Sequence, residues 1–174
     1  MSGIPFGIHA EQLTAPNLWR GMVFAEGARP APDLWKAWDS LGLVDDGVAL
    51  VGWWEPTPLV TVTEHGGNSS QPAVFASVYL RSRAHQIKEG GDDSTAKKPR
   101  AVVAVASWAN TGNITCTLNI DWARLGLSAS SATITATSIK NFQGDLTVPA
   151  SRATIEVPAA KGWLLAIDGP ARTA

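Results

Sequence analysis

One stretch near the start of the chain has the spacing of apolar residues that a helix requires. Between residues 30 and 42, large apolar side chains recur at intervals of three and four residues, which places them on one helical face. They are Leu34, Trp35, Trp38 and Leu41. Pro32 suits the first turn, where its missing N–H costs nothing, and Gly42 suits the position after the last turn. We therefore predict a helix within residues 30–42.

From residue 48 onward the pattern changes to short apolar runs separated by glycine, proline and asparagine. Residues 114–120 alternate strictly, with Ile114, Cys116, Leu118 and Ile120 on one face, as in a half-buried strand. Residues 101–108 are apolar enough for a strand that is buried on both faces. Further strands are expected at residues 48–54, 74–80, 132–137, 153–157 and 163–167. Such a series predicts an antiparallel β-sandwich.

These patterns divide the chain near residue 47. A helical segment, residues 1–47, precedes a β-sandwich domain, residues 48–174. Two polar stretches within the second part, residues 65–72 and 88–100, are predicted loops. The fold class is therefore mainly β, with a short helical segment in front.

Tryptophan dominates the aromatic composition, with 8 Trp against 4 Phe and 1 Tyr. The flat indole can build a core or stack on a sugar ring, and composition leaves both uses open. The net charge of −1 argues against general electrostatic binding of nucleic acid or an anionic membrane. No apolar run is long enough for a membrane span, and the first residues lack the pattern of a signal peptide.

The sequence offers no pattern for a cofactor or a metal. Glycine-rich phosphate loops are absent, and the three histidines, His9, His65 and His85, lie far apart. The single Cys116 excludes an internal disulfide and a cysteine-cluster zinc site. No residue is assigned a catalytic role.

The best candidates for a ligand contact are carboxylates beside aromatic residues. Glu55 directly follows Trp53 and Trp54, and an acid beside an aromatic platform is what a sugar-binding site uses. Glu26, after Phe24, is the second such acid. Trp53, Trp54, Glu55 and Glu26 are thus candidate glycan contacts, although Glu55 also fits a surface residue at a strand end.

Two asparagines stand in formal glycosylation sequons at predicted turns or loops. They are Asn68, in Asn68-Ser-Ser70, and Asn113, in Asn113-Ile-Thr115. They matter only if the chain is secreted, and the sequence leaves the location open.

Two sets of short motifs follow one another along the chain. The first is SGIPFG (2–7), LWRGM (18–22), LWKAWD (34–39) and GWWEP (52–56); the second is VVAVASW (102–108), DWARLGL (121–127) and KGWLLA (161–166). Together they resemble the late part of large glycoside-hydrolase-like proteins, a domain of unknown function related to glycoside hydrolase family 123. Members of that group carry a (β/α) barrel followed by a C-terminal β-sandwich.

The resemblance implies that most of a barrel would precede Met1, and that residues 1–47 resemble its end. The catalytic acids would lie mainly on those barrel strands, at their C-terminal face. We therefore expect the isolated chain not to hydrolyse glycosides, although its parent would be a glycoside hydrolase. Its role would be to support the barrel and to contact glycan. The location would be extracellular if the parent is a secreted glycosidase.

Two other functions remain open at this point. The chain could be a stand-alone, lectin-like module that binds glycan through an exposed tryptophan. It could instead be a structural subunit of a larger assembly, with Trp19, Trp35 and Trp38 buried against a partner protein.

Overall fold

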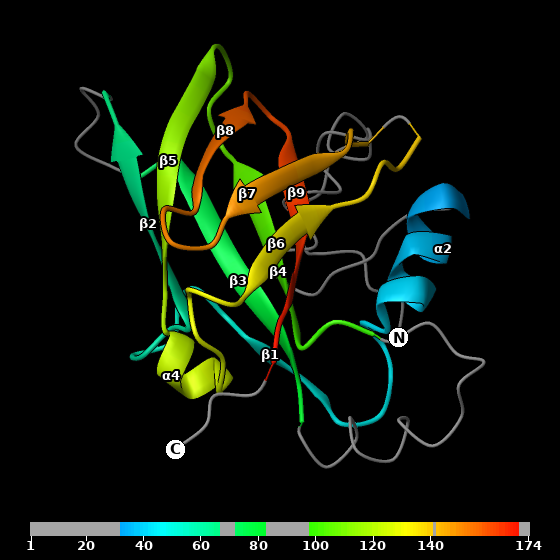
Figure 1. Cartoon of the computed structure of the whole chain (residues 1–174). Helices are drawn as coiled ribbons and strands as arrows, with labels where there is room; N and C mark the ends of the chain where they lie inside the picture. The colour runs from blue at the N-terminus through cyan, green and yellow to red at the C-terminus, as the bar shows by residue number, and fades with distance from the viewer. Residues whose placement is uncertain (1–31, 67–71, 83–97, 141, 171–174) are drawn as a thin grey trace.

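The computed structural model describes residues 32–66, 72–82, 98–140 and 142–170. Over these residues the chain is an antiparallel β-sandwich with few helices, as predicted (Figure 1). The described helices are α2 (Pro32–Leu41) and α4 (Trp122–Leu125). The described strands are β1 (Val48–Val51), β2 (Val60–His65), β3 (Val74–Arg81), β4 (Ala101–Ser107), β5 (Asn113–Ile120), β6 (Thr133–Ala136), β7 (Leu146–Pro149), β8 (Thr154–Pro158) and β9 (Gly162–Asp168).

The strands form two sheets of unequal size. The large sheet has six strands in the order β1-β3-β4-β9-β6-β7, and the small sheet has three in the order β2-β5-β8. Every strand pairing among the described residues is antiparallel. In the large sheet β9 lies between β4 and β6, so the hairpin β6–β7 joins the other strands only through β9.

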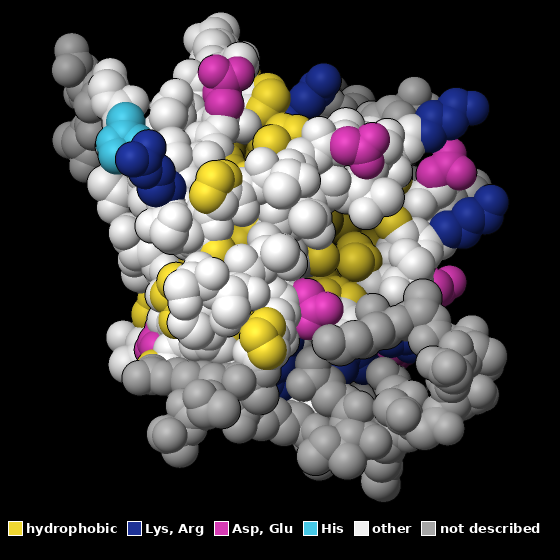
Figure 2. Space-filling view, viewed as in Figure 1, with side chains coloured by type: hydrophobic (Ala, Val, Ile, Leu, Met, Phe, Trp, Pro, Cys, Tyr) yellow, Lys and Arg dark blue, Asp and Glu magenta, His cyan; other side chains and the backbone are white. Residues whose placement is uncertain are grey.

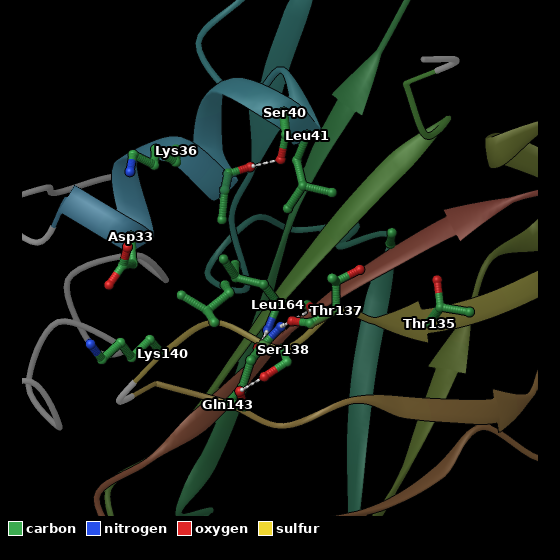
Figure 3. Close-up of a pocket in the computed structure, with 13 residues that line it drawn as sticks. Asp33, Lys36, Ser40, Leu41, Thr135, Thr137, Ser138, Lys140, Gln143 and Leu164 are labelled. Atoms are coloured by element: carbon green, nitrogen blue, oxygen red, sulfur yellow. Dashed lines mark hydrogen bonds between the residues drawn. The ribbon is translucent and has the colours of Figure 1, made fainter.

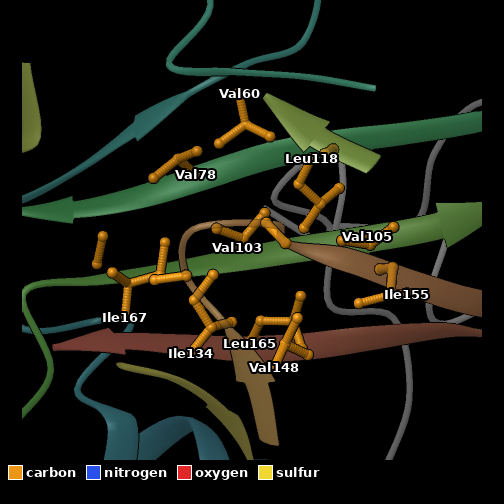
Figure 4. Close-up of a cluster of buried hydrophobic side chains, with 14 of the residues drawn as sticks. Val60, Val78, Val103, Val105, Leu118, Ile134, Val148, Ile155, Leu165 and Ile167 are labelled. Carbon is orange, nitrogen blue, oxygen red and sulfur yellow. The ribbon is translucent and has the colours of Figure 1, made fainter. Parts of the chain in front are cut away.

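The main core lies between the two sheets. Val103 and Val105 of β4 project into it from the large sheet, together with Leu165 of β9, and all three are completely buried. Leu118 of β5 and Ile155 of β8 meet them from the small sheet (Figure 4). Burying such a side chain contributes about 1.5–3 kcal/mol, so this layer supplies much of the stability of the fold.

Burial along β5 alternates from residue to residue, as its sequence pattern predicts. Cys116 and Leu118 are buried in the core between the sheets, and Ile114 and Ile120 are partly buried against it. The intervening residues of the strand point to the outer face of the small sheet. Cys116 therefore serves as a small core residue.

The outer face of the large sheet is also covered. All seven residues of β4 are buried, which explains why this segment is apolar throughout. On the outer face, Val102 and Ala104 of β4 share a second apolar cluster with Leu34 and Trp38 of α2. The predicted helix is thus confirmed at Pro32–Leu41, and it packs on the sheet through the face that the spacing predicts.

The outer face of the small sheet is polar instead. Exposed threonine and asparagine side chains bond to one another across its three strands. His65 Nε2 lies 2.7 Å from Thr117 Oγ1, which lies 3.1 Å from Thr154 Oγ1. Figure 2 shows a surface over β2, β5 and β8 that is mostly uncharged and polar, with small apolar patches. This face suits water, whereas the outer face of the large sheet does not.

The C-terminal end of α2 is fixed by an arginine from β3. Gly42 follows the helix with a φ of +65°, a conformation that glycine adopts readily. The buried Arg81 donates through Nη2 to the carbonyl oxygen of Gly42 (3.1 Å) and to Asp45 Oδ2 (3.0 Å). A cation suits this position because the helix dipole is negative at its C-terminal end.

The predicted strand at residues 48–54 is too long. β1 ends at Val51, and the backbone turns at once: Glu55 N donates to the Gly52 carbonyl oxygen (3.2 Å). Trp53 and Trp54 therefore do not alternate across a sheet, as their expected place on a strand implied. The structure also adds strands β2 and β7, which the sequence pattern did not single out.

The motif DWARLGL forms a single helical turn, α4, after β5. Asp121 precedes the turn and accepts a hydrogen bond from the backbone N–H of Arg124 (3.0 Å). Gly126 ends it in the left-handed region, and Leu125 and Leu127 enter the main core. Among the described residues, no helix combines the length and the hydrophobicity that crossing a membrane requires.

Candidate functional site

The turn after β1 presents one tryptophan to solvent. Trp54 is 50% exposed, and its ring meets Trp53 edge to face at a centroid distance of 6.0 Å. Trp53 is partly buried and lies 4.4 Å from Phe75 of β3. The structure therefore brings Trp53 and Trp54 together, with the first holding the second in place. An exposed indole on a rigid support can stack on a sugar ring.

Phe75 continues this aromatic row across the outer face of the large sheet. Its ring meets that of Trp108 edge to face at 5.1 Å. The backbone N–H of Trp53 donates to the hydroxyl of the buried Ser77 on the same strand (3.3 Å), which ties the turn to β3. The row is thus built on the sheet, and it extends the apolar cluster beneath α2.

Glu55 lies beside Trp54 but has a structural contact of its own. Its Oε1 accepts a hydrogen bond from the backbone N–H of Gly52 (3.2 Å), so the carboxylate helps to close the turn. A methyl group at Gly52 would lie about 2.5 Å from the Trp54 ring, so a larger residue there would have to displace that ring. The partner acid Glu26 lies outside the described residues, as does Asn68. The role of these residues as glycan contacts stays a prediction.

A second candidate is a pocket of about 410 Å³ between α2 and the outer face of the large sheet. Asp33 and Lys36 line it from α2, Leu164 from β9, and Lys140 from the turn after β6. Figure 3 shows the charged side chains toward one end of the pocket and Thr135 of β6 toward the other. Polar side chains thus surround an apolar floor.

The Gln143 side chain forms hydrogen bonds with the backbone of β9 at Leu164, a position that β6 does not reach. Its Oε1 accepts from the backbone N–H of Leu164 (2.8 Å), and its Nε2 donates to the carbonyl oxygens of Leu164 (3.3 Å) and Thr137 (2.8 Å). The turn is closed again by a backbone bridge between Ile139 and Gln143. The pocket wall is therefore fixed on the sheet by hydrogen bonds.

Sequence reasoning missed this pocket. Its lining comes from three segments, residues 33–41, 135–143 and 164–166, which are far apart in the chain. The motifs LWKAWD and KGWLLA overlap two of these segments but do not indicate a pocket, and Gln143 stands in a stretch that suggests only a turn. Only the pairing of β6 with β9 and the packing of α2 bring them together.

Among the described residues, three titratable groups have pKa values shifted from their ordinary values, and each shift has an identifiable cause. A hydrogen bond from Lys98 (2.6 Å), followed by one from Arg81, lowers the pKa of Asp45. Burial raises the pKa of Cys116 to about 12, and burial raises that of Tyr79 further above its usual value. These shifts describe buried or paired structural groups rather than reactive ones.

The remaining predicted positions have the following places. Asn113 is exposed at the start of β5, and its side chain donates to Glu156 Oε1 (2.7 Å). Trp38 is buried within the chain itself, whereas Trp35 keeps some exposure; Trp19 lies outside the described residues.

Within the described parts of the chain, no three side chains of His, Cys, Asp or Glu gather as a metal site would require.

A comparison of the sequence with protein families relates part of this sandwich to a known domain. A family model described as "Glycoside hydrolase 123, C-terminal domain" matches residues 93–168. Residues 93–168 are therefore similar to the C-terminal domain of glycoside hydrolase 123 proteins. The resemblance predicted from the motifs is thereby confirmed over this segment. No curated protein and no solved structure gives a significant match to the chain.

The glycoside hydrolase 123 match covers only part of the sandwich. It ends at the last residue of β9 and includes β4 to β9, whereas β1, β2, β3 and α2 lie before it. The Trp54 turn is therefore outside the matched segment. The matched segment contains only part of the pocket lining: the residues from β6 and β9 lie inside it, and those from α2 lie outside it.

Proposed function

We propose that the chain is the C-terminal β-sandwich portion of a carbohydrate-active, glycoside-hydrolase-like protein, and that it supports a catalytic barrel. It does not catalyse hydrolysis by itself. The glycoside hydrolase 123 C-terminal domain match over residues 93–168 agrees with this role, because such a domain belongs beside a larger enzyme.

The observation that carries the proposal is the contrast between the two outer faces. A two-layer sandwich needs only one apolar face on each sheet. The small sheet meets this rule, and its outer face is polar. The large sheet departs from it, since its outer face carries α2 and a row of partly exposed aromatic rings. A face of this composition suits packing against a further protein domain, and we assign it to the barrel.

The candidate acid fits a supporting role better than catalysis. Glycosidases use two carboxyl groups about 5–10 Å apart, one on each side of the scissile bond. Glu55 closes its own turn through one oxygen. The acids of the reaction would accordingly lie on the barrel.

Hydrolysis by the pure chain gives the first test. Aryl glycosides should show no turnover with the wild-type chain or with Glu55→Gln. Turnover that Glu55→Gln abolishes would show that the chain is catalytic by itself.

The barrel role is tested in the source organism. We would recover the protein with an antibody and measure its intact mass. We expect a mass well above the 18.3 kDa of this chain, with peptides upstream of Met1, or a barrel protein that copurifies. A product of 18.3 kDa that copurifies with no such protein would contradict the proposal.

Glycan contact at the turn is a second candidate function, favoured by the half-exposed Trp54 ring. A stacked sugar should change tryptophan fluorescence when oligosaccharides are titrated into the chain. The change should vanish in Trp54→Ala. Binding measured by calorimetry should be lost in Trp54→Ala and persist in Trp54→Phe, which keeps an aromatic face. An equal response in wild type and Trp54→Ala would rule out this contact.

A further inference from the structure

We propose that the pocket between α2 and the large sheet binds a sugar acid, that is, a monosaccharide with one carboxylate, either free or at the end of a glycan. The choice of a sugar acid among organic acids rests on the proposed function. The existence of an anion-selective pocket rests on the geometry alone.

The size and depth of the pocket suit a small ligand. Its volume of about 410 Å³ falls within the range of small-molecule sites, about 300–1,000 Å³. The apolar floor includes Leu164, Ile139 and Ala166, and the C–H groups of a sugar ring can rest on such a surface. The pocket is open at the surface of one sheet, so it suits a chain end or a free monosaccharide.

The pocket walls are held in place before any ligand arrives. α2 is anchored by Leu34 and Trp38, which are 2% and 6% exposed, and Arg81 binds the end of the helix. The facing wall is anchored by the three hydrogen bonds of Gln143. Such a preformed site loses little conformational entropy when a ligand binds.

The charges that line the pocket favour an anion. Lys36 and Lys140 contribute two positive charges, and Asp33 contributes one negative charge. Among the contacts of the described residues, neither lysine forms an ion pair with a protein carboxylate. A ligand carboxylate at the charged end of the pocket would therefore meet two ammonium groups that pair with no described carboxylate, and it would receive charge-assisted hydrogen bonds from them.

The other polar groups favour a ligand with hydroxyls. The hydroxyls of Thr135 and Thr137 line the pocket, and within the described part of the chain they bond to no protein group. The described lining contains no aromatic side chain, so a neutral pyranose would lack the usual stacking surface. The carboxylate is therefore the group that gives affinity, and the hydroxyls add selectivity.

Isothermal titration calorimetry of the full chain tests this proposal. The probes are D-glucuronate, D-glucose, which replaces the carboxylate with a hydroxymethyl group, and acetate, which lacks the ring. We expect glucuronate alone to bind, with weaker binding at higher sodium chloride concentration. Lys36→Gln and Lys140→Gln should each weaken binding about tenfold, since each removes one charged hydrogen bond. Lys161→Gln, a change of an exposed lysine outside the pocket, should leave the affinity unchanged.

Each alternative outcome overturns a defined part of the proposal. Equal binding of glucose would show that the carboxylate is not recognised, and equal binding of acetate would show a site for any small anion. An oligosaccharide with a terminal glucuronate distinguishes the two sources: tighter binding than the free acid favours a glycan end, and weaker binding favours the free sugar. Absence of glucuronate binding would reject the pocket as a sugar-acid site. The barrel role would stand in that case, since the recovered mass tests it separately.

Discussion

Gly162 lies where β9 pairs with β4 in the middle of the large sheet, opposite Ala106. A methyl group added there would overlap the carbonyl oxygen of Val105. It would also approach the carbonyl carbon of Val105 to 3.0 Å and Cα of Ala106 to 3.1 Å. All of these atoms belong to backbone, so no side chain can rotate away. We therefore expect Gly162→Ala to push β9 away from β4.

The loss of stability in Gly162→Ala should be large because backbone, and not a side chain, has to move to make room for the methyl group. Overpacking of a core usually costs about 1–3 kcal/mol, and a backbone obstacle leaves no cheap relaxation. We expect Gly162→Ala to lower the free energy of unfolding by about 3 kcal/mol or more. The melting temperature should fall by about 6–12 °C, from about 2–4 °C for each kcal/mol in a chain of this size.

Urea unfolding followed by tryptophan fluorescence measures this change. Gly144→Ala is the matched control, because nothing lies within 4 Å of the added methyl group and its φ is not positive. That variant should be neutral, or more stable by about 0.4–1 kcal/mol. If Gly162→Ala unfolds within about 0.5 kcal/mol of wild type, the reasoning from the β4–β9 contact is refuted.

Three further predictions concern buried or paired groups. Arg81→Met should lower the free energy of unfolding in urea by about 2–4 kcal/mol. Lys98→Met should lower it by about 1 kcal/mol or less, because Lys98 is more exposed than Arg81. Equal losses in the two variants would contradict the role of Arg81 at the end of α2. The lowered pKa of Asp45 contributes stability above its unfolded value of 3.8, so this contribution should be lost as pH falls through the folded pKa, and Asp45→Asn should flatten the acid limb of a stability–pH curve. Folding raises the pKa of the Cys116 thiol from 9.0 to about 12, so the thiol ionises at a lower pH in the unfolded chain than in the folded one. The free energy of unfolding should therefore fall between pH 9 and pH 12. If Cys116→Ala loses stability equally over this pH range, Cys116 is not the cause.

The sequence predicted those elements whose apolar residues have an unbroken pattern. The uniform run of β4, the alternation of β5 and the helical spacing of α2 all correspond to the observed burial. β2 was missed because only Val60 and Val62 mark its inner face, while the rest of the strand is threonine, glutamate and histidine. β7 was missed because it has four residues and ends at Pro149.

The candidate site was predicted only in part, for a physical reason. Trp53 and Trp54 do meet, but in a turn, because Gly52 and Glu55 close the backbone after Val51. Local pattern can suggest such a cluster when its members are neighbours in the chain. The pocket needs residues that are more than 100 positions apart, and only long-range strand pairing brings them together.

The position of β9 has a consequence for the newly synthesised protein. β9 is made after the other eight described strands, yet it occupies the middle of the large sheet. Until the ribosome releases it, β4 has one bare edge, and the β6–β7 hairpin has no partner. The emerging chain would then expose an apolar strand edge of the kind that pairs with other chains. Protection by a chaperone should therefore matter most in the short interval before residues 162–168 leave the ribosome.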